Sequence, residues 1–313
     1  MQRLEAAIIR TLLYADIFNC ALTLPELHHY LLHDAPVTLA QLEEVICASG
    51  DLQQAVCHRA GYYALAERPE LIARSAQQHA LAATLLPAAH HYAGWLARLP
   101  FVRMVALTGA LAACNPAHPN DDYDYLIVTQ PGRVWLARAG AVLLVRLAKR
   151  RGVTLCPNFV LSQDALAQTK CDVFIAHEIA QMLPLYGVAV YADLRAANPW
   201  TAQLLPNALG AFKAPSPINV QGGWDWLKRG LEVVLGGWLG DRVEAWEYQR
   251  KRRRFARQLQ TPGSSAKIDA MQVKGHFNDH GHPVVRRYHE RIARYGLSLE
   301  RNDTSETFAL AGD

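Results

Sequence analysis

Residues 108–129, TGALAACNPAHPNDDYDYLIVT, decide how this chain folds. The apolar run 102–107 before them predicts a strand that ends at Gly109, and residues 123–129 predict a second strand after a polar loop. Side chains alternate between the two faces of a strand, so Asp122 and Asp124 share one face and two tyrosines share the other. The stretch therefore predicts two strands of a sheet, with a pair of carboxylates where the second strand begins.

The carboxylate pair has the chemistry of a divalent-cation site. Two carboxylates two positions apart on a strand can share one cation, and Mg²⁺ typically binds one or two carboxylates together with substrate phosphates. Gly109 has no Cβ, so backbone amides of a short helix after it can approach a phosphate closely. We predict Asp122 and Asp124 as metal ligands. The alternative interpretation is a polar strand start whose acids are only solvated.

The stretch resembles the signature of the DNA polymerase beta-like nucleotidyltransferase superfamily, in which Gly-Ser or Gly-Gly follows an apolar residue and precedes a spacer and Asp-x-Asp. Here Gly109-Ala110 is followed by eleven residues and then by Asp122-Tyr123-Asp124. Three longer stretches are similar to bacterial nucleotidyltransferase-domain proteins with a helical N-terminal extension: VRMVALTGALA, DYDYLIVTQPGRVWLAR and AHEIAQMLPLYG.

The resemblance implies a fold, an activity and a set of site residues. The fold would be an α/β (α+β) nucleotidyltransferase mixed sheet with helices. The activity would be Mg²⁺-dependent transfer of a nucleoside monophosphate from an NTP, with ATP expected. Gly109 and Ala110 would lie at the nucleotide phosphates, and Asp122 and Asp124 would hold Mg²⁺. A small-molecule hydroxyl, a protein side chain and a nucleic-acid end remain open as the acceptor.

Two positions depart from the family pattern. Ala110 stands where the family prefers Ser or Gly, so a hydroxyl contact to phosphate is lost while the backbone N–H remains. The strand expected over 153–161 has no acid, and Asn158 takes the place of the family's third carboxylate. An amide can orient a water or a metal, but it cannot act as a general base. The chain is therefore either an active nucleotidyltransferase or a degenerate member that binds nucleotides or partners as an adaptor.

The first 75 residues predict three short helices followed by a hairpin over 53–57 and 62–66, which resembles a winged helix. Capping boxes begin two of these helices, at Thr23 and at Thr38. The segment holds five arginines, no lysine and nine acids, which give it a net charge of −4. DNA binding needs cations against the phosphates, and the presumed recognition helix carries Glu43 and Glu44 instead. We expect packing or protein contact here rather than a DNA-binding regulator.

The rest of the chain predicts strands alternating with helices and then a helical tail. We expect a long helix over 68–99, a helix over 134–149, mainly helical structure over 172–212 and a basic helical tail over about 224–300. The expected divisions are a winged-helix-like module at 1–75, a connecting helix at 76–99, a nucleotidyltransferase core at 100–215 and a basic C-terminal region at 216–313.

The composition of the 313 residues excludes several classes of protein. Hydrophobic residues make up 51% and charged residues 19%, so the chain can bury a substantial core. No apolar run reaches the ~18 residues needed to span a bilayer. The six cysteines are dispersed without a CxxC pair, which predicts reduced, mostly buried thiols in a cytoplasmic protein. A zinc ribbon, a disulfide scaffold and a membrane span are not expected.

Two groups outside the signature carry weaker candidate chemistry. His276, Asp279, His280 and His282 could bind zinc, could contact phosphate at the rim of the site together with Lys274, or could form a basic surface. His177-Glu178 could be an acid–base pair, although a glutamate in the first turn of a helix also suits the helix dipole. Asp172 could supply the missing third carboxylate if the chain folds back.

A basic run over 250–254 follows a helix that contains Trp238 and Trp246. Cations interleaved with aromatic rings can bind nucleic acid or an anionic membrane face, and they also occur at the solvated end of an amphipathic helix. Residues 231–239 permit contact with a membrane surface or a partner helix.

Overall fold

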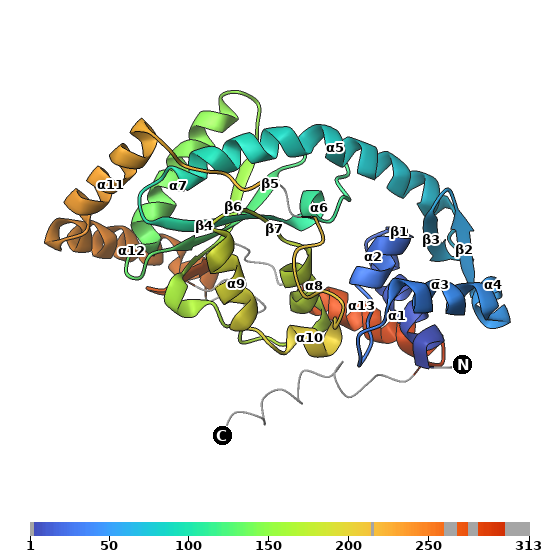
Figure 1. Cartoon of the computed structure of the whole chain (residues 1–313). Helices are drawn as coiled ribbons and strands as arrows, with labels where there is room; N and C mark the ends of the chain where they lie inside the picture. Colours follow the sequence, from blue (N-terminus) through green and yellow to red (C-terminus); the bar gives the residue numbers. More distant parts are fainter. Residues whose placement is uncertain (1–2, 214–215, 260–267, 275–280, 298–313) are drawn as a thin grey trace, which may run out of the picture.

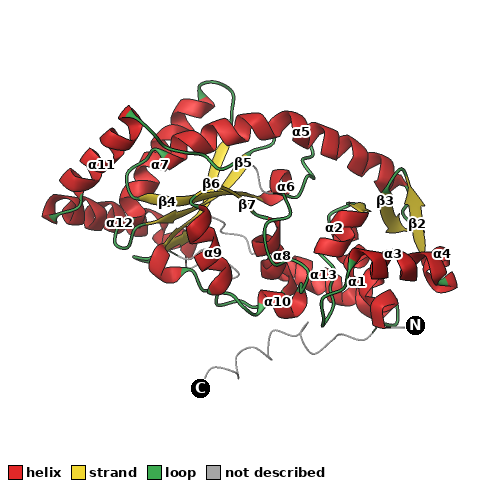
Figure 2. Cartoon of the chain, viewed as in Figure 1, coloured by secondary structure: helices red, strands yellow, loops and turns green. Residues whose placement is uncertain are grey.

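The computed structural model describes residues 3–213, 216–259, 268–274 and 281–297. Five strands form a mixed sheet in the order β7-β4-β5-β6-β8. Figure 2 shows its labelled strands β4 to β7 in yellow, with helices around them. Strands β5 and β6 run parallel and are connected by α7, whereas every other pair is antiparallel. The strands are β4 (Val102–Thr108), β5 (Tyr123–Thr129), β6 (Leu155–Ser162), β7 (Leu183–Tyr186) and β8 (Gln272–Lys274).

The signature strands and the helix after them lie where the sequence predicts them. Strand β5 begins and ends at the expected residues, and so does helix α7 (Val134–Lys149). Strands β7 and β8 lie in segments expected to be helical, so the prediction was wrong there. β7 is an edge strand of four residues that contains Pro184, and β8 has only three residues. Neither is long enough to give an alternating pattern.

Helices cover both faces of the sheet (Figure 1). Helix α5 (Glu70–Ala97) crosses one face, where the Tyr125 hydroxyl donates a hydrogen bond to the carbonyl of Ala89 at 2.7 Å. Helix α8 (Val173–Gln181) packs against the other face, toward which Asp124 projects. The remaining helices after the first strand of this sheet are α6 (Gly109–Ala112), α9 (Val188–Ala196), α10 (Thr201–Leu204), α11 (Gly223–Leu235), α12 (Trp238–Leu259) and α13 (Gly281–Arg294).

The N-terminal segment folds into four helices and a small antiparallel sheet of order β1-β3-β2. Both predicted capping boxes are present, at Thr23 and at Thr38. The hairpin is shorter than expected, because Ser49 caps an additional helical turn that takes up residues 53–55. These elements are α1 (Arg3–Ile17), β1 (Leu22–Thr23), α2 (Leu24–His29), α3 (Leu39–Ala48), α4 (Gly50–Ala55), β2 (Val56–Arg59) and β3 (Tyr62–Leu65).

One hydrophobic cluster joins the N-terminal helices to the sheet. It contains Ile8 and Leu12 of α1, Met104 and Leu126 of the sheet, and Ile179 of α8. The expected boundary at residue 75 is therefore not a gap in the core.

No helix within the described ranges has the length and apolarity needed to cross a membrane. All six cysteines are free thiols, but only Cys114 is fully buried, so the expectation that most are buried was wrong.

Candidate functional site

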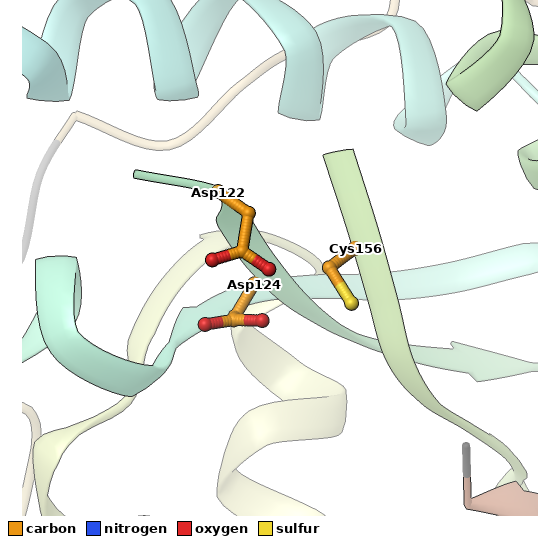
Figure 3. A group of neighbouring side chains, drawn as sticks. All are labelled: Asp122, Asp124 and Cys156. Carbon is orange, nitrogen blue, oxygen red and sulfur yellow. The ribbon is translucent and has the colours of Figure 1, made fainter. Parts of the chain in front are cut away.

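The two predicted carboxylates lie together at the start of β5. Asp122 immediately precedes the strand and is exposed, whereas Asp124 lies within it and is half-buried. Tyr123 and Tyr125 point to the opposite face and are buried there, as the alternation of a strand requires. Figure 3 shows the two carboxylates projecting to the same side of β5, with Cys156 approaching from the neighbouring strand β6.

Gly109 lies directly against Asp124. The register of β4 and β5 pairs Thr108 with Asp124, and the next residue, Gly109, turns the chain into α6 with φ at +67°. A Cβ at this position would collide with the Asp124 carboxylate. Glycine is therefore required twice here, once for the left-handed backbone and once for the close approach of the carboxylate.

Asn158 touches the carboxylate pair through its amide nitrogen. Its Nδ2 donates a hydrogen bond to Asp124 Oδ1, and its Oδ1 accepts one from the Cys156 thiol at 2.6 Å. This orientation is the favourable one, because the opposite flip would place two oxygens against each other. Asn158 lies beside Asp124 and presents an N–H donor to it.

The electrostatics of the pair fit a hard cation. Burial and then the negative charge of Asp122 raise the pKa of Asp124, the hydrogen bond from Asn158 lowers it, and the result is a pKa of about 7. One ligand atom from each of Asp122, Asp124 and Cys156 lies within 4.8 Å of the others. Burial raises the pKa of Cys156 to about 12, so the thiol stays neutral and the carboxylates are the oxygen ligands that suit Mg²⁺.

Asp122 and Asp124 line a cavity of about 340 Å³. Cationic and amide side chains from separate segments converge on it: Lys170 and Gln168 precede α8, and Lys274 ends β8. The lining also includes the acids Asp172 and Glu178, the small or polar residues Thr108, Gly109, Asn158 and Gly281, and the apolar residues Leu126, Phe159, Phe174, Ile175, Ile179, Met182 and Leu194. A cavity that combines carboxylates for a cation, two lysines and apolar walls suits a ligand that combines phosphates with an uncharged ring.

Glu178 was considered from the sequence only as half of an acid–base pair with His177 or as a glutamate in the first turn of a helix. It is the sixth residue of α8, so the interpretation of a first-turn glutamate was wrong. Burial raises the pKa of its carboxyl, and the positive charge of Lys274 lowers it. Its charge raises the pKa of Asp124, and both residues line the same cavity. The available signal was its helical spacing from Phe174, which puts both residues on the face of α8 that lines the cavity.

The other residues considered near Glu178 have structural roles. Asp172 caps α8 by accepting a hydrogen bond from the Ile175 N–H at 2.9 Å, and it also lines the cavity. His177 points away from the carboxylates and is buried, with its ring stacked on Tyr14 at 3.8 Å between centroids. Burial lowers the pKa of His177 to about 4, so it is a neutral core histidine.

A second cavity of about 290 Å³ adjoins the first behind α6. Gly109, Phe174 and Glu178 border both cavities, whereas Ala110 lines only the second. Its aromatic lining residues are Tyr14, Phe18 and Tyr30 from the N-terminal segment, Phe174 from α8, and Phe212. The predicted phosphate turn therefore lies between two cavities.

The segment from Lys274 to His282 is only partly described. Lys274 lines the first cavity, in agreement with its expected position at the rim, and His282 is exposed at the start of α13. His276, Asp279 and His280 lie outside the described residues.

The chain matches no known protein family, no curated protein and no solved structure at a significant level of similarity.

Proposed function

We propose that this chain is a Mg²⁺-dependent nucleotidyltransferase of the polymerase beta-like type, which transfers a nucleoside monophosphate from an NTP to an acceptor. The observation that carries the proposal is the contact of Gly109 with the Asp124 carboxylate beside Asp122, at the mouth of a cavity. A glycine turn next to paired carboxylates lets phosphates and a cation meet at one point.

Each side chain at this point has a task in the proposed reaction. Asp122 and Asp124 would hold the cation, and Asn158 keeps the Asp124 carboxylate in position through its N–H. Bound Mg²⁺ would supply charge neutralisation for the triphosphate and the leaving pyrophosphate. Lys170 and Lys274 bring positive charge to the same cavity for the phosphate oxygens.

Glu178 supports catalysis rather than binding alone. In the transfer, the acceptor oxygen bonds to the α-phosphorus, the bond to pyrophosphate breaks, and the acceptor hydroxyl loses its proton. Strand β6 offers no acid for that proton, but the Glu178 carboxylate lies between the two cavities and has a raised pKa. A carboxylate with a raised pKa is a stronger base, so we assign proton acceptance to Glu178 and the acceptor to the second cavity.

The test is nucleotide-dependent thermal stabilisation. A ligand that binds only the folded chain stabilises it by about 2.7 kcal/mol at a concentration of about 100 times Kd. We expect at least one NTP to raise the melting temperature in the presence of Mg²⁺, and Asp122→Ala/Asp124→Ala to lose this effect. Asp193→Ala is the matched control, because Asp193 is an exposed acid that lines neither cavity. The absence of stabilisation by any NTP would refute the proposal.

The second candidate is a binding-only adaptor of the same fold, which the amide at Asn158 favours. It predicts the same Mg²⁺-dependent stabilisation but no release of pyrophosphate with any acceptor. In either case we propose that the N-terminal elements form a winged-helix-like module that packs on the core. Its helix α3 presents Glu43 and Glu44, and repulsion between these acids and phosphates disfavours DNA as its partner.

A further inference from the structure

Helix α11 buries its charged face and exposes its apolar face. In a globular protein, an amphipathic helix normally buries its apolar face and exposes its charged face. In α11 the charged face contacts the protein: Lys228 is only 5% exposed and donates hydrogen bonds to the carbonyls of Ala97 and Val102 at 2.7 and 2.8 Å. Glu232 on the same face accepts from the Phe101 N–H at 2.6 Å and pairs with Arg103 at 2.8 Å.

The apolar face of α11 consequently points outward. Trp226 is 78% exposed and Val233 is 81% exposed, and the rest of this face is formed by Leu227, Leu231 and Val234, which are also exposed. Trp224 instead packs edge-on against Trp95 of α5, with 5.4 Å between ring centroids. The four polar bonds on the opposite face fix this orientation. The exposed apolar side chains are therefore a property of the fold rather than of a loosely attached helix.

Helix α12 continues the same arrangement after the Gly236-Gly237 turn. Its Glu244 accepts the backbone N–H groups of Trp135 and Leu136 at 2.8 and 2.7 Å, so this acid faces the protein and caps α7. Trp238 and Trp246 point outward and are 69% and 62% exposed. An arginine lies over each ring, Arg242 over Trp238 and Arg250 over Trp246, with 5.3 and 5.1 Å to the ring centroids. We call the outward faces of α11 and α12 the tryptophan face.

The acids of α11 and α12 are paired, which leaves an excess of positive charge on these helices. All five acids of the two helices are held by a partner: Asp225 by Arg229, Glu232 by Arg103, Asp241 by Arg133, Glu244 by two amides, and Glu247 by Arg250 and Lys251. Arg242 and residues 252–254 are exposed cations beside this face. The tryptophan face therefore combines exposed apolar side chains with exposed cations.

We propose that the tryptophan face binds an anionic lipid surface. Tryptophan and arginine favour the headgroup region, where a ring lies against acyl chains and a guanidinium reaches phosphate. Helix α11 is about 20 Å long, shorter than the bilayer's hydrocarbon core, so it lies in the interface plane. Together α11 and α12 occupy the end of the molecule opposite the N-terminal helices (Figure 1), so the membrane contacts one end of the chain.

Two other occupants fit the tryptophan face less well. A single-stranded nucleic acid would stack on the tryptophans, but it would leave exposed aliphatic side chains such as Val233 and Leu227 without a partner. A second copy of this chain would bring two arginine-rich edges together, and like charges at an interface oppose association. An anionic lipid surface offers acyl chains to the aliphatic side chains and phosphates to the cationic ones.

The test is sedimentation of the full chain with vesicles. We expect binding to phosphatidylcholine vesicles that contain phosphatidylglycerol, weaker binding to pure phosphatidylcholine, and a blue shift of tryptophan fluorescence on binding. Trp226→Ser/Val233→Ser should weaken the binding by at least about tenfold, because two large apolar side chains no longer enter the lipid. Leu143→Ser/Leu209→Ser is the matched control, because both leucines are exposed elsewhere on the surface. Arg252→Glu/Arg253→Glu should remove the preference for anionic vesicles.

Other outcomes would overturn the proposal. Wild-type protein that stays in the supernatant with anionic vesicles would refute it, as would equal sedimentation of Trp226→Ser/Val233→Ser with an unchanged melting temperature. A dimer in light scattering that this variant dissociates would assign the face to a second copy. Retention of single-stranded DNA by the wild type but not by the variant, without vesicle binding, would assign it to nucleic acid. None of these measurements depends on nucleotide binding.

Discussion

At the scale of single residues, Gly109 connects the backbone of β4 to the carboxylates of β5. Gly109→Ala should cost about 1–2 kcal/mol for the left-handed backbone and should also displace the Asp124 carboxylate. We therefore expect the loss of Mg²⁺-dependent stabilisation by NTP together with a lower melting temperature. Gly132→Ala separates the two effects, since Gly132 has φ at +69° and open space around its Cβ position. It should lower the melting temperature similarly and keep the nucleotide response. Equal nucleotide responses in the two variants would contradict the assignment.

The sequence predicts the carboxylates of this site better than their surroundings. Asp122, Asp124 and Gly109 follow from the alternation of one strand and from one glycine, which are local patterns. Glu178 and Lys274 reach the same cavity from a helix and a strand far along the chain. The spacing of Glu178 from Phe174 and the cationic composition around Lys274 are local signals, but the meeting of both residues beside Asp124 depends on how the sheet is ordered, which no local spacing encodes.

At the scale of elements, His177 joins α8 to α1 as a neutral ring. It stacks on Tyr14, and its Nδ1 lies 2.8 Å from the Val173 carbonyl. Its pKa of about 4 in the folded chain lies below the ordinary value of 6.5, so the unfolded chain takes up the proton first as the pH falls. The stability contributed by the neutral ring should therefore be fully present above about pH 6.5. Toward pH 4 the free energy of unfolding should decrease by up to about 3 kcal/mol.

This acid sensitivity can be assigned with two variants. Urea denaturation across the pH range should show a smaller decrease for His177→Phe, which keeps an aromatic ring on Tyr14 but cannot bind the proton. Part of the slope should remain, because burial also lowers the pKa of His29 to about 4. His58→Phe is the control, since His58 also stacks on a tyrosine but is exposed. An unchanged slope in His177→Phe would refute the assignment.

The buried cation Lys228 supplies two of the four polar bonds that orient helix α11. Lys228→Met should destabilise the chain by about 1–3 kcal/mol, because the carbonyls of Ala97 and Val102 lose their donor while remaining buried. Arg229→Met on the exposed side of the same helix should change stability by less than about 0.5 kcal/mol. Thermal or urea unfolding measures both. A Lys228→Met variant as stable as wild type would mean that these bonds do not hold the helix.

A helix or strand could be predicted from the sequence where the pattern that marks it lies within its own residues. The amphipathic period of α7 and the alternation of β5 gave the correct boundaries, and the capping boxes at Thr23 and Thr38 marked true helix starts. The edge strands β7 and β8 were missed because they form only by pairing with β4 and β6. For α11 the sequence indicated only that residues 231–239 permit contact with a membrane surface or a partner helix, because hydrophobic periodicity shows that a helix has two faces but not which one contacts the protein.

At the scale of the whole molecule, the N-terminal helices and the sheet share one core. Ile8 and Leu12 pack in the same cluster as Met104 and Ile179, and Arg291 of α13 pairs with Asp16 of α1. Elements that bury each other's apolar surface unfold together, because separation would expose that surface to water. We expect calorimetry to show a single transition for the full chain, although the sequence divides it into four segments. A chain lacking residues 1–66 should fail to fold, since it would leave this cluster open to solvent. Two resolved transitions, or a folded truncated chain, would mean that the N-terminal segment is an independent domain.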